Sequence, residues 1–290
     1  METKTLKATL KSGRKMPIVG FGTYQIRGTS LIRDVLDYAL GAGYRSIDTA
    51  AVYGNETDIG SALKTLLPKY NLKREDIFIT TKLSPSDHGE KALDAVKQSL
   101  KNLDCGYLDL YLIHWPGQSR LSIHDPSNIA IRAKTWEKLI EAKKQGLVKD
   151  IGVSNYTIKH LEELDKSNSE IPAVNQVEWH PFYHQSDLKN YCKQKGILLQ
   201  AYSSLGGTNN PDLMTNEVVV EIAKNLNKSP SQVLLKWAVQ QGVGIIPKAR
   251  SKSHIEENIN LDFEIPEKDL DKLNNIGTMT KFAWDPTDVA

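Results

Sequence analysis

Two side chains in one short stretch of the chain could carry out proton chemistry. The stretch runs from Tyr44 to Glu56 and contains the carboxylate of Asp48 and the phenol of Tyr53. An unperturbed phenol has a pKa of about 10, so it is a poor proton donor at neutral pH unless a neighbouring group lowers that value. A cation beside the phenol would lower it by stabilising the phenolate. Proton transfer by Tyr53 therefore calls for a cation that the fold brings beside it.

Lys82 and His114 are the candidates that could complete such a site. The β-branched run Ile77–Thr81 ends at Lys82, and the run Tyr107–Ile113 ends at His114. A lysine would lower the pKa of the phenol, a carboxylate would hold that lysine charged, and a histidine can orient a carbonyl oxygen. Taken one at a time, these residues also have ordinary structural explanations, such as a helix cap, a solvated lysine or a buried histidine.

The pattern of apolar segments predicts a fold that would bring these residues together. Short strand-like runs, each ending in polar or small residues, alternate with segments whose apolar residues repeat at helical spacing. The predicted strands are Met16–Thr23, Tyr44–Ile47, Ile77–Thr81, Tyr107–Ile113, Val148–Val153, Val174–Val177, Ile197–Ala201 and Val243–Pro247. Eight such units in about 250 residues favour an α/β fold of the closed (β/α)8 type, the TIM barrel. The carboxyl ends of successive barrel strands are neighbours, and they are where barrel enzymes place their chemistry.

We expect a single domain over residues 1–290, with an N-terminal β-hairpin. Leu6–Leu10 and Lys15–Val19 flank the turn Lys11–Arg14, which is typical of a hairpin ahead of the barrel. No linker, low-complexity tract or shift in composition divides the chain.

Composition and charge narrow the function. The 37 Lys and Arg residues nearly balance 35 Asp and Glu residues, and the net charge of +2 argues against nucleic acid or a membrane as the main partner. Cys105 and Cys192 provide neither a disulfide framework nor a metal-ligand cluster. No apolar run is typical of a signal peptide or of a transmembrane helix. We therefore expect a cytoplasmic protein that binds a small molecule and no metal.

Several motifs of this chain resemble the aldo-keto reductase superfamily, nearly from end to end. In chain order they are Gly43–Ala50 with Tyr53–Glu56, Leu108–Pro116, Ile151–Asn155 and Ile246–Lys248. The resemblance implies an NADPH-dependent oxidoreductase that reduces aldehydes and ketones to alcohols, and we expect a monomer. It also implies that Tyr53 is the general acid in reduction, that Lys82 tunes its pKa, that Asp48 pairs with Lys82, and that His114 positions the substrate carbonyl.

The same resemblance implies a set of cofactor-binding residues. The fragment Gly20-x-Gly22 lacks the third glycine of a Rossmann phosphate loop, so that type of site is a poor fit. By resemblance, a group of polar residues would bond the nicotinamide carboxamide: Ser154, Asn155 and Gln176. Tyr202 would stack on the nicotinamide ring, although an ordinary half-buried aromatic is the alternative for that residue. The remaining predicted cofactor contacts are Gly22, Thr23, Tyr24, Asp48, Ser203, Leu205, Lys248, Arg250, His254, Glu257 and Asn258.

The predicted contacts to the 2′-phosphate of NADPH depart from the family pattern. Lys248 matches the family lysine, but Ala249 stands where a serine is common and His254 where an arginine often is. Histidine lacks the bidentate fork of a guanidinium, and Arg250 is an additional nearby cation that we expect to compensate for it. We expect NADPH to be preferred, with NADH as a weaker alternative.

We expect a broad substrate range. By resemblance, Tyr24, His114 and Trp115 line the substrate pocket, and Ser84 replaces a bulky aromatic of some members. Three segments that usually close the family pocket are short or moderate here: residues 117–130, residues 206–213 and the tail after Trp284.

Two other interpretations remain open at this level. The chain could be a family member that binds the cofactor without turnover, as a regulatory subunit or a crystallin-like protein, because a fold does not guarantee a function. It could also be a different barrel enzyme, such as a lyase that uses Lys82 as a Schiff base. That second interpretation leaves Tyr53 and His114 unexplained.

Overall fold

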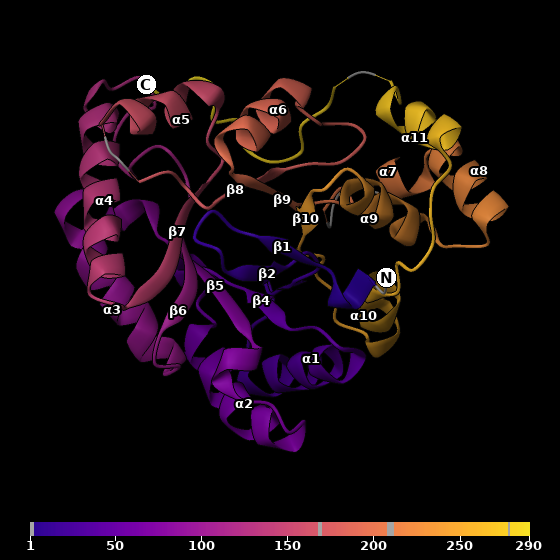
Figure 1. Ribbon diagram of the computed structural model, residues 1–290, viewed down its shortest axis with the longest axis horizontal. Helices are drawn as coiled ribbons and strands as arrows, with labels where there is room; N and C mark the ends of the chain where they lie inside the picture. Colours follow the sequence, from indigo (N-terminus) through magenta and orange to yellow (C-terminus); the bar gives the residue numbers. More distant parts are fainter. Residues whose placement is uncertain (1–2, 168–169, 208–211, 278) are drawn as a thin grey trace.

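The structure is a computed structural model that describes residues 3–167, 170–207, 212–277 and 279–290. Its centre is a sheet of eight strands, each hydrogen-bonded in parallel to the next in chain order (Figure 1). The strands are β3 (Phe21–Gly22), β4 (Ser46–Asp48), β5 (Phe78–Leu83), β6 (Leu108–Ile113), β7 (Val148–Ser154), β8 (Val174–Glu178), β9 (Leu198–Tyr202) and β10 (Gly244–Ile245).

The two edges of this sheet meet, so the sheet closes on itself. Val19, just before β3, forms a parallel bridge with Ile245 of β10. The N–H of Gly20 donates to the carbonyl oxygen of Ile245 at 2.8 Å, and the N–H of Gly22 donates to that of Pro247 at 3.1 Å. A side chain at Gly22 would not fit this seam, because its Cβ would lie 2.6 Å from the carbonyl oxygen of Ile246. The predicted (β/α)8 barrel is confirmed.

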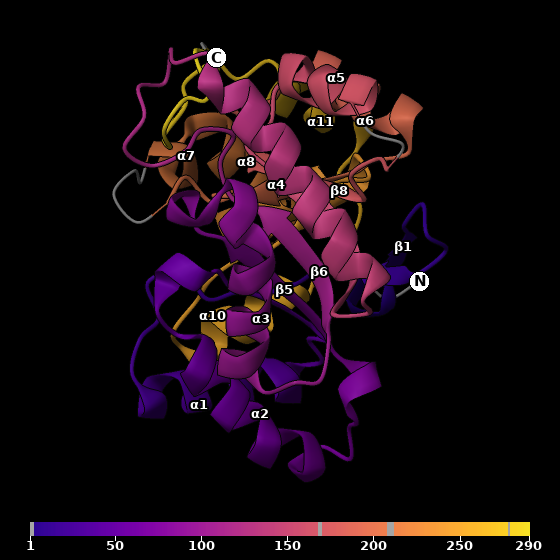
Figure 2. The same ribbon diagram turned by 90° about the vertical axis from the view of Figure 1, so that its left-hand side faces the viewer.

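Helices surround the sheet and bury their apolar faces against it (Figures 1 and 2). They are α1 (Thr29–Ala42), α2 (Glu56–Lys69), α3 (Ala92–Leu103), α4 (Ser127–Lys144), α5 (Ile158–Ser167), α6 (Ser186–Lys195), α7 (Asp212–Thr215), α8 (Glu217–Leu226), α9 (Pro230–Gln240), α10 (Lys252–Ile259) and α11 (Glu267–Asn274). Short 3-10 turns cover Thr3–Thr5, Ala51–Tyr53, Arg74–Asp76, Pro85–Asp87 and Gly89–Lys91. None of the helices in the described ranges is long and apolar enough to cross a membrane.

The predicted N-terminal hairpin is present and lies against one end of the barrel. Its antiparallel strands are β1 (Lys7–Thr9) and β2 (Lys15–Pro17). Buried Leu10 and Met16 pack with residues near the amino ends of the barrel strands, such as Phe78. The carboxyl ends of the strands therefore face away from the hairpin.

Candidate active site

The structure brings the four predicted catalytic residues together at the carboxyl ends of three adjacent strands. Asp48 is the last residue of β4, Lys82 is in β5, and His114 directly follows β6. Tyr53 ends the 3-10 turn that follows β4. Because β4, β5 and β6 are neighbours in the barrel, residues about thirty positions apart in sequence reach one small area.

Lys82 is the centre of this cluster. Its ammonium group donates to Asp48 Oδ1 at 2.5 Å, to the carbonyl oxygen of Thr49 at 2.9 Å and to the Tyr53 hydroxyl at 3.4 Å. The ring of His114 lies edge-on to the ring of Tyr53, with 5.8 Å between the ring centroids. Asp48 and Lys82 are both buried, while Tyr53 is half-buried. Among Asp48, Lys82 and Tyr53, the phenol of Tyr53 is thus the group that faces the rim formed by the carboxyl ends of the strands.

The Lys82 amine is held as an ammonium ion. Burial alone would lower the pKa of Lys82, but the carboxylate of Asp48 and the phenol of Tyr53 outweigh burial, and the pKa is raised. A Schiff base requires a neutral amine that a carbonyl can reach. Lys82 has no exposed surface, and three acceptors surround its nitrogen. This environment disfavours the lyase interpretation.

The net pKa of Tyr53 differs from the expectation. Burial raises the pKa of the phenol, and Lys82, the largest opposing influence, does not cancel that effect. The prediction of a lowered pKa is wrong in this structure, because spacing in the sequence shows a neighbouring cation but not the loss of solvent. Tyr53 is therefore a protonated hydroxyl throughout the neutral range, and Lys82 limits how far its pKa rises.

His114 is a neutral imidazole. Burial, reinforced by the charge of Lys82, lowers its pKa to about 3. Its Nδ1 atom is buried without a hydrogen-bond partner in the part of the chain that the structure describes. A neutral imidazole next to Tyr53 can donate one hydrogen bond to a carbonyl oxygen, as positioning of a substrate requires.

These two pKa directions predict a simple pH profile. A His114 pKa of about 3 places its charge change below the range of about pH 5 to 8 in which an ordinary histidine titrates. The raised pKa of Tyr53 keeps the phenol protonated there and moves its loss to alkaline pH. We expect kcat/KM for aldehyde reduction to stay level between about pH 5 and 8 and to fall only at higher pH. A sigmoidal change near pH 6.5 that vanishes in His114→Gln would contradict the neutral histidine.

One buried residue whose role is not evident from the sequence, Asn55, holds the Tyr53 loop in place. Asn55 has no exposed surface, and its Oδ1 accepts from the Thr49 hydroxyl at 2.6 Å. Its amide donates to the carbonyl oxygens of Thr23 at 3.1 Å and Ile26 at 2.9 Å. These contacts tie the loop after β4 to the loop after β3. The predicted cofactor contact Thr23 is also fully buried, and its hydroxyl donates to the carbonyl oxygen of Asp48.

A hydrogen-bond chain continues from the catalytic group across the barrel. The second carboxylate oxygen of Asp48 accepts from Gln176 Nε2 at 2.7 Å, and the same amide nitrogen donates to Gln200 Oε1 at 2.8 Å. Both hydrogens of the Gln176 amide are therefore used. The side-chain oxygen of Gln176 is left to accept a hydrogen bond from another molecule. Gln200 is fully buried, and nothing in its sequence context marks it as part of the site.

The other predicted carboxamide contacts lie beside Gln176. Ser154 donates to the backbone oxygen of Gln176 at 2.7 Å, and Asn155 donates to that of His114 at 2.9 Å. Tyr202 donates its hydroxyl to Asn155 Oδ1 at 2.7 Å. Asn155 and Ser203 both have left-handed backbones, with φ of 63° and 53°. Such strained non-glycine residues gather at functional sites, where the surrounding structure holds them.

The predicted phosphate contacts gather at the amino end of α10. Arg250 is exposed and donates to the carbonyl oxygen of Gln25 at 2.8 Å, while Lys248, two residues earlier in the chain, is half-buried. Burial and the nearby charge of Arg250 lower the pKa of Lys248. Neither cation forms an ion pair within the described ranges. Two unpaired cations beside a helix amino end favour an anion there.

Three of the remaining predicted contacts, His254, Glu257 and Asn258, lie in α10. His254 is exposed in the first turn of α10, and its N–H is capped by Ser251 at 3.3 Å. Glu257 Oε1 accepts from the hydroxyls of Ser229 and Ser231. Asn258 is buried in the same helix, and Leu205 is half-buried after β9.

Five aromatic rings in succession form the mouth of the site. Centroid distances are 5.2 Å from Tyr24 to Tyr53, 6.1 Å from His114 to Trp115 and 4.9 Å from Trp115 to Trp284. Tyr24 and Trp284, at the two ends, are about half exposed. Trp284, just before the third predicted closing segment, packs against Trp115 on this side of the site. Residues 208–211 of the second predicted closing segment lie outside the described residues.

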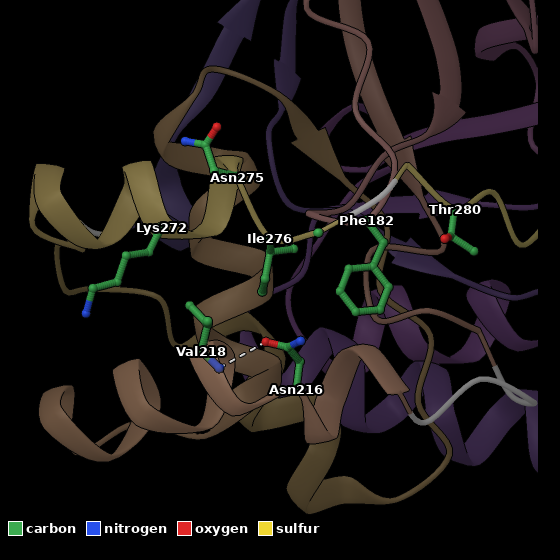
Figure 3. Close-up of a pocket in the computed structure, with 8 residues that line it drawn as sticks. Phe182, Asn216, Val218, Lys272, Asn275, Ile276 and Thr280 are labelled. Atoms are coloured by element: carbon green, nitrogen blue, oxygen red, sulfur yellow. Dashed lines mark hydrogen bonds between the residues drawn. The ribbon is translucent and has the colours of Figure 1, made fainter.

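A separate pocket of about 550 Å³ lies beside the chain that leads into the tail (Figure 3). It is lined by residues such as Phe182, Asn216 and Ile276, none of which is a predicted site residue. The lining ammonium of Lys272 is already paired with Glu221 and Asp269. We therefore place the chemistry at Tyr53 rather than in this pocket. No group of three or more His, Cys, Asp or Glu that could hold a metal occurs within the described ranges.

Comparisons with known proteins agree with this geometry. The model of the Aldo/keto reductase family matches residues 19–278. A glyoxal reductase of Bacillus subtilis is 39% identical over 289 residues, which cover 98% of this chain and 98% of that protein. A glycerol 2-dehydrogenase (NADP(+)) of Saccharomyces cerevisiae is also 39% identical, with 92% of this chain and 89% of that protein covered. A solved Bombyx mori aldo-keto reductase in complex with NADP superposes with a TM-score of 0.87 at 29% identity, over 96% of this chain and 94% of that one.

Proposed function

The chain belongs to the aldo/keto reductase family, and on that premise we propose that it reduces aldehydes and ketones to alcohols with NADPH. The observation that carries this proposal is the protonated phenol of Tyr53 at the rim, bonded to the Lys82 ammonium group at 3.4 Å and flanked by the neutral ring of His114. A proton donor and a carbonyl-orienting donor side by side are what carbonyl reduction requires of a protein.

Each residue of the cluster has a role that follows from its contacts. The nicotinamide, when bound, supplies the hydride. Tyr53 holds the proton that the developing alkoxide needs, and Lys82 favours the phenolate that remains. Asp48 holds Lys82 charged and in place through the 2.5 Å contact. The neutral ring of His114, which lies beside the ring of Tyr53, orients the substrate oxygen toward Tyr53.

The residues present fit the nicotinamide cofactor. The Gln176 side-chain oxygen is left as an acceptor for an amide N–H, since both of its amide hydrogens are used. Ser154 and Asn155 lie beside it, and Tyr202 is held by Asn155. Lys248 and Arg250 would hold the phosphate end. The NADP of the silk moth structure and the NADP(+) named for the yeast relative support NADPH as the preferred dinucleotide.

Lys248→Met tests the preference for NADPH. Loss of a charged contact to the 2′-phosphate should raise KM for NADPH about 10- to 100-fold and leave KM for NADH within about twofold. The matched control is Lys268→Met, which removes an exposed lysine of α11. Steady-state kinetics with each dinucleotide decide the outcome. An equal rise for NADH, or comparable kcat/KM for both dinucleotides in the wild type, would contradict the assignment.

We also propose a broad substrate range, which a carbonyl panel tests. The mouth is lined by the partly exposed rings of Tyr24, Trp115 and Trp284. These rings carry no charge that would select for one particular substrate. We expect turnover of several aldehydes and small ketones. Activity confined to one bulky steroid would overturn this proposal. Binding of NADPH without consumption by any member of the panel would favour the non-catalytic alternative.

A further inference from the structure

The chain after α11 is fastened to the barrel at two places; we call residues 281–290 the tail. The first fastening is Glu178, the last residue of β8, whose side chain is fully buried. Its Oε1 accepts from the N–H of Phe282 at 2.6 Å and from His180 Nε2 at 3.0 Å. Its Oε2 accepts from the N–H of Ala283 at 2.9 Å and from the Lys281 ammonium group at 2.5 Å. A carboxylate has about four acceptor positions, and all are used.

The second fastening lies at the far end of the tail, beside α4 and α5 (Figures 1 and 2). The N–H of Ala290 donates to the carbonyl oxygen of Ile123 at 2.7 Å, and its own carbonyl oxygen accepts from Arg132 Nη1 at 2.6 Å. The carbonyl oxygen of Val289 lies 3.1 Å from His160 Nε2, and the Val289 side chain is fully buried. The tail is therefore held at both ends.

Trp284 lies between these fastenings and directly follows the Glu178 contacts. The two backbone N–H groups that bond Glu178 belong to Phe282 and Ala283, so they fix the peptide that leads into Trp284. The indole of Trp284 meets that of Trp115 at 4.9 Å with an interplanar angle of 70°. Burial raises the pKa of Glu178, but the bonds from His180 and Lys281 outweigh it and lower that pKa to about 2. The carboxylate of Glu178, which binds the tail, is therefore ionised throughout the neutral range.

We propose that Glu178 is a positioning residue for substrate specificity: it fixes Trp284 beside Trp115 and so favours aromatic over small aliphatic aldehydes. This inference rests on the proposed function, since it concerns the pocket of that reaction. Glutamine in its place offers one oxygen and two N–H donors, so at least two of the four donors lose their acceptor. An aromatic aldehyde gains binding energy by packing against the fixed ring of Trp284, whereas a short aliphatic aldehyde gains little.

Limited proteolysis and kinetics of Glu178→Gln test the proposal together. The Lys281 side chain is 12% exposed, and we expect tryptic cleavage after Lys281, followed by intact mass, to become about tenfold faster in Glu178→Gln. We expect kcat/KM for 4-nitrobenzaldehyde to fall about three- to tenfold, with a much smaller change for propanal. Trp284→Ala should show the same kinetic loss, and the double variant no further loss. Glu264→Gln, which removes an exposed carboxylate, is the control.

Several results would overturn this inference. Unchanged protection of the Lys281–Phe282 bond would show that Glu178 does not hold the tail. Equal losses for both aldehydes, or additive losses in the double variant, would show that it acts elsewhere. If Glu178→Gln does not fold, Ala283→Pro removes one tail N–H donor without altering β8 and should give the same pattern. Absence of turnover by the wild type would refute the proposed function, while the proteolysis arm would still test the fastening.

Discussion

Tyr53→Phe should lower kcat for carbonyl reduction about 10²- to 10⁴-fold, the usual contribution of a positioned general acid. The substitution removes only the hydroxyl that lies 3.4 Å from Lys82 Nζ. The ring contacts with Tyr24 and His114 are kept, so we expect the Kd for NADPH and the free energy of unfolding to change little. Single-turnover reduction of 4-nitrobenzaldehyde, compared with fluorescence titration of NADPH, separates the two effects.

A matched control exists on the outer layer of the barrel. Tyr191 of α6 is partly buried and distant in the fold from β4, so Tyr191→Phe removes a hydroxyl without touching the site. We expect its kcat to remain within about twofold of the wild type. A kcat of Tyr53→Phe within tenfold of the wild type would mean that another group, or water, supplies the proton.

Lys82→Met should be the most destabilising single change in the site. It leaves the carboxylate of Asp48 buried without its cation, which costs about 3–5 kcal/mol in comparable buried pairs. Asp48 keeps only the bond from Gln176 among its described side-chain partners. The variant should also lose activity, because nothing then opposes the effect of burial on the Tyr53 pKa. Urea unfolding monitored by circular dichroism measures the loss in the free energy of unfolding.

The double variant Lys82→Met/Asp48→Leu decides whether the unpaired charge is the cause. Replacement of both partners by apolar groups should recover a large part of the lost stability, because no charge is left buried. Activity should remain low, since the phenol still lacks its cation. If the double variant is no more stable than Lys82→Met, cavity formation or strain explains the loss instead.

Much of the fold and the centre of the site could be predicted because their signals are local. Each barrel strand is a short apolar run, and its polar end residue is adjacent in sequence, so Asp48, Lys82 and His114 could be placed at one rim. The sequence signals for helix ends are equally local. Gly43, for example, adopts the left-handed φ of 107° that ends α1. Ser229 and Gln232 form the capping box that begins α9.

The rest of the site depends on contacts between distant parts of the chain. Asn55 and Gln200 are ordinary polar residues in sequence, and only the folded chain shows that one anchors the Tyr53 loop and the other holds Gln176. The bonds between Glu178 and the tail join residues more than a hundred positions apart. The net pKa of Tyr53 depends on burial, a property of the packed structure and not of residue spacing.

The most direct test of the proposed function is transfer of deuterium from NADPH labelled at nicotinamide C4 to an aldehyde by the purified protein. The two C4 positions are labelled in separate preparations, and the alcohol product is analysed by mass spectrometry. We predict that one of the two preparations gives 4-nitrobenzyl alcohol with one deuterium per molecule, in step with NADPH consumption, and that Tyr53→Phe gives almost none. If the wild-type protein binds NADPH but yields no labelled alcohol from any carbonyl compound, the proposed reductase activity is wrong.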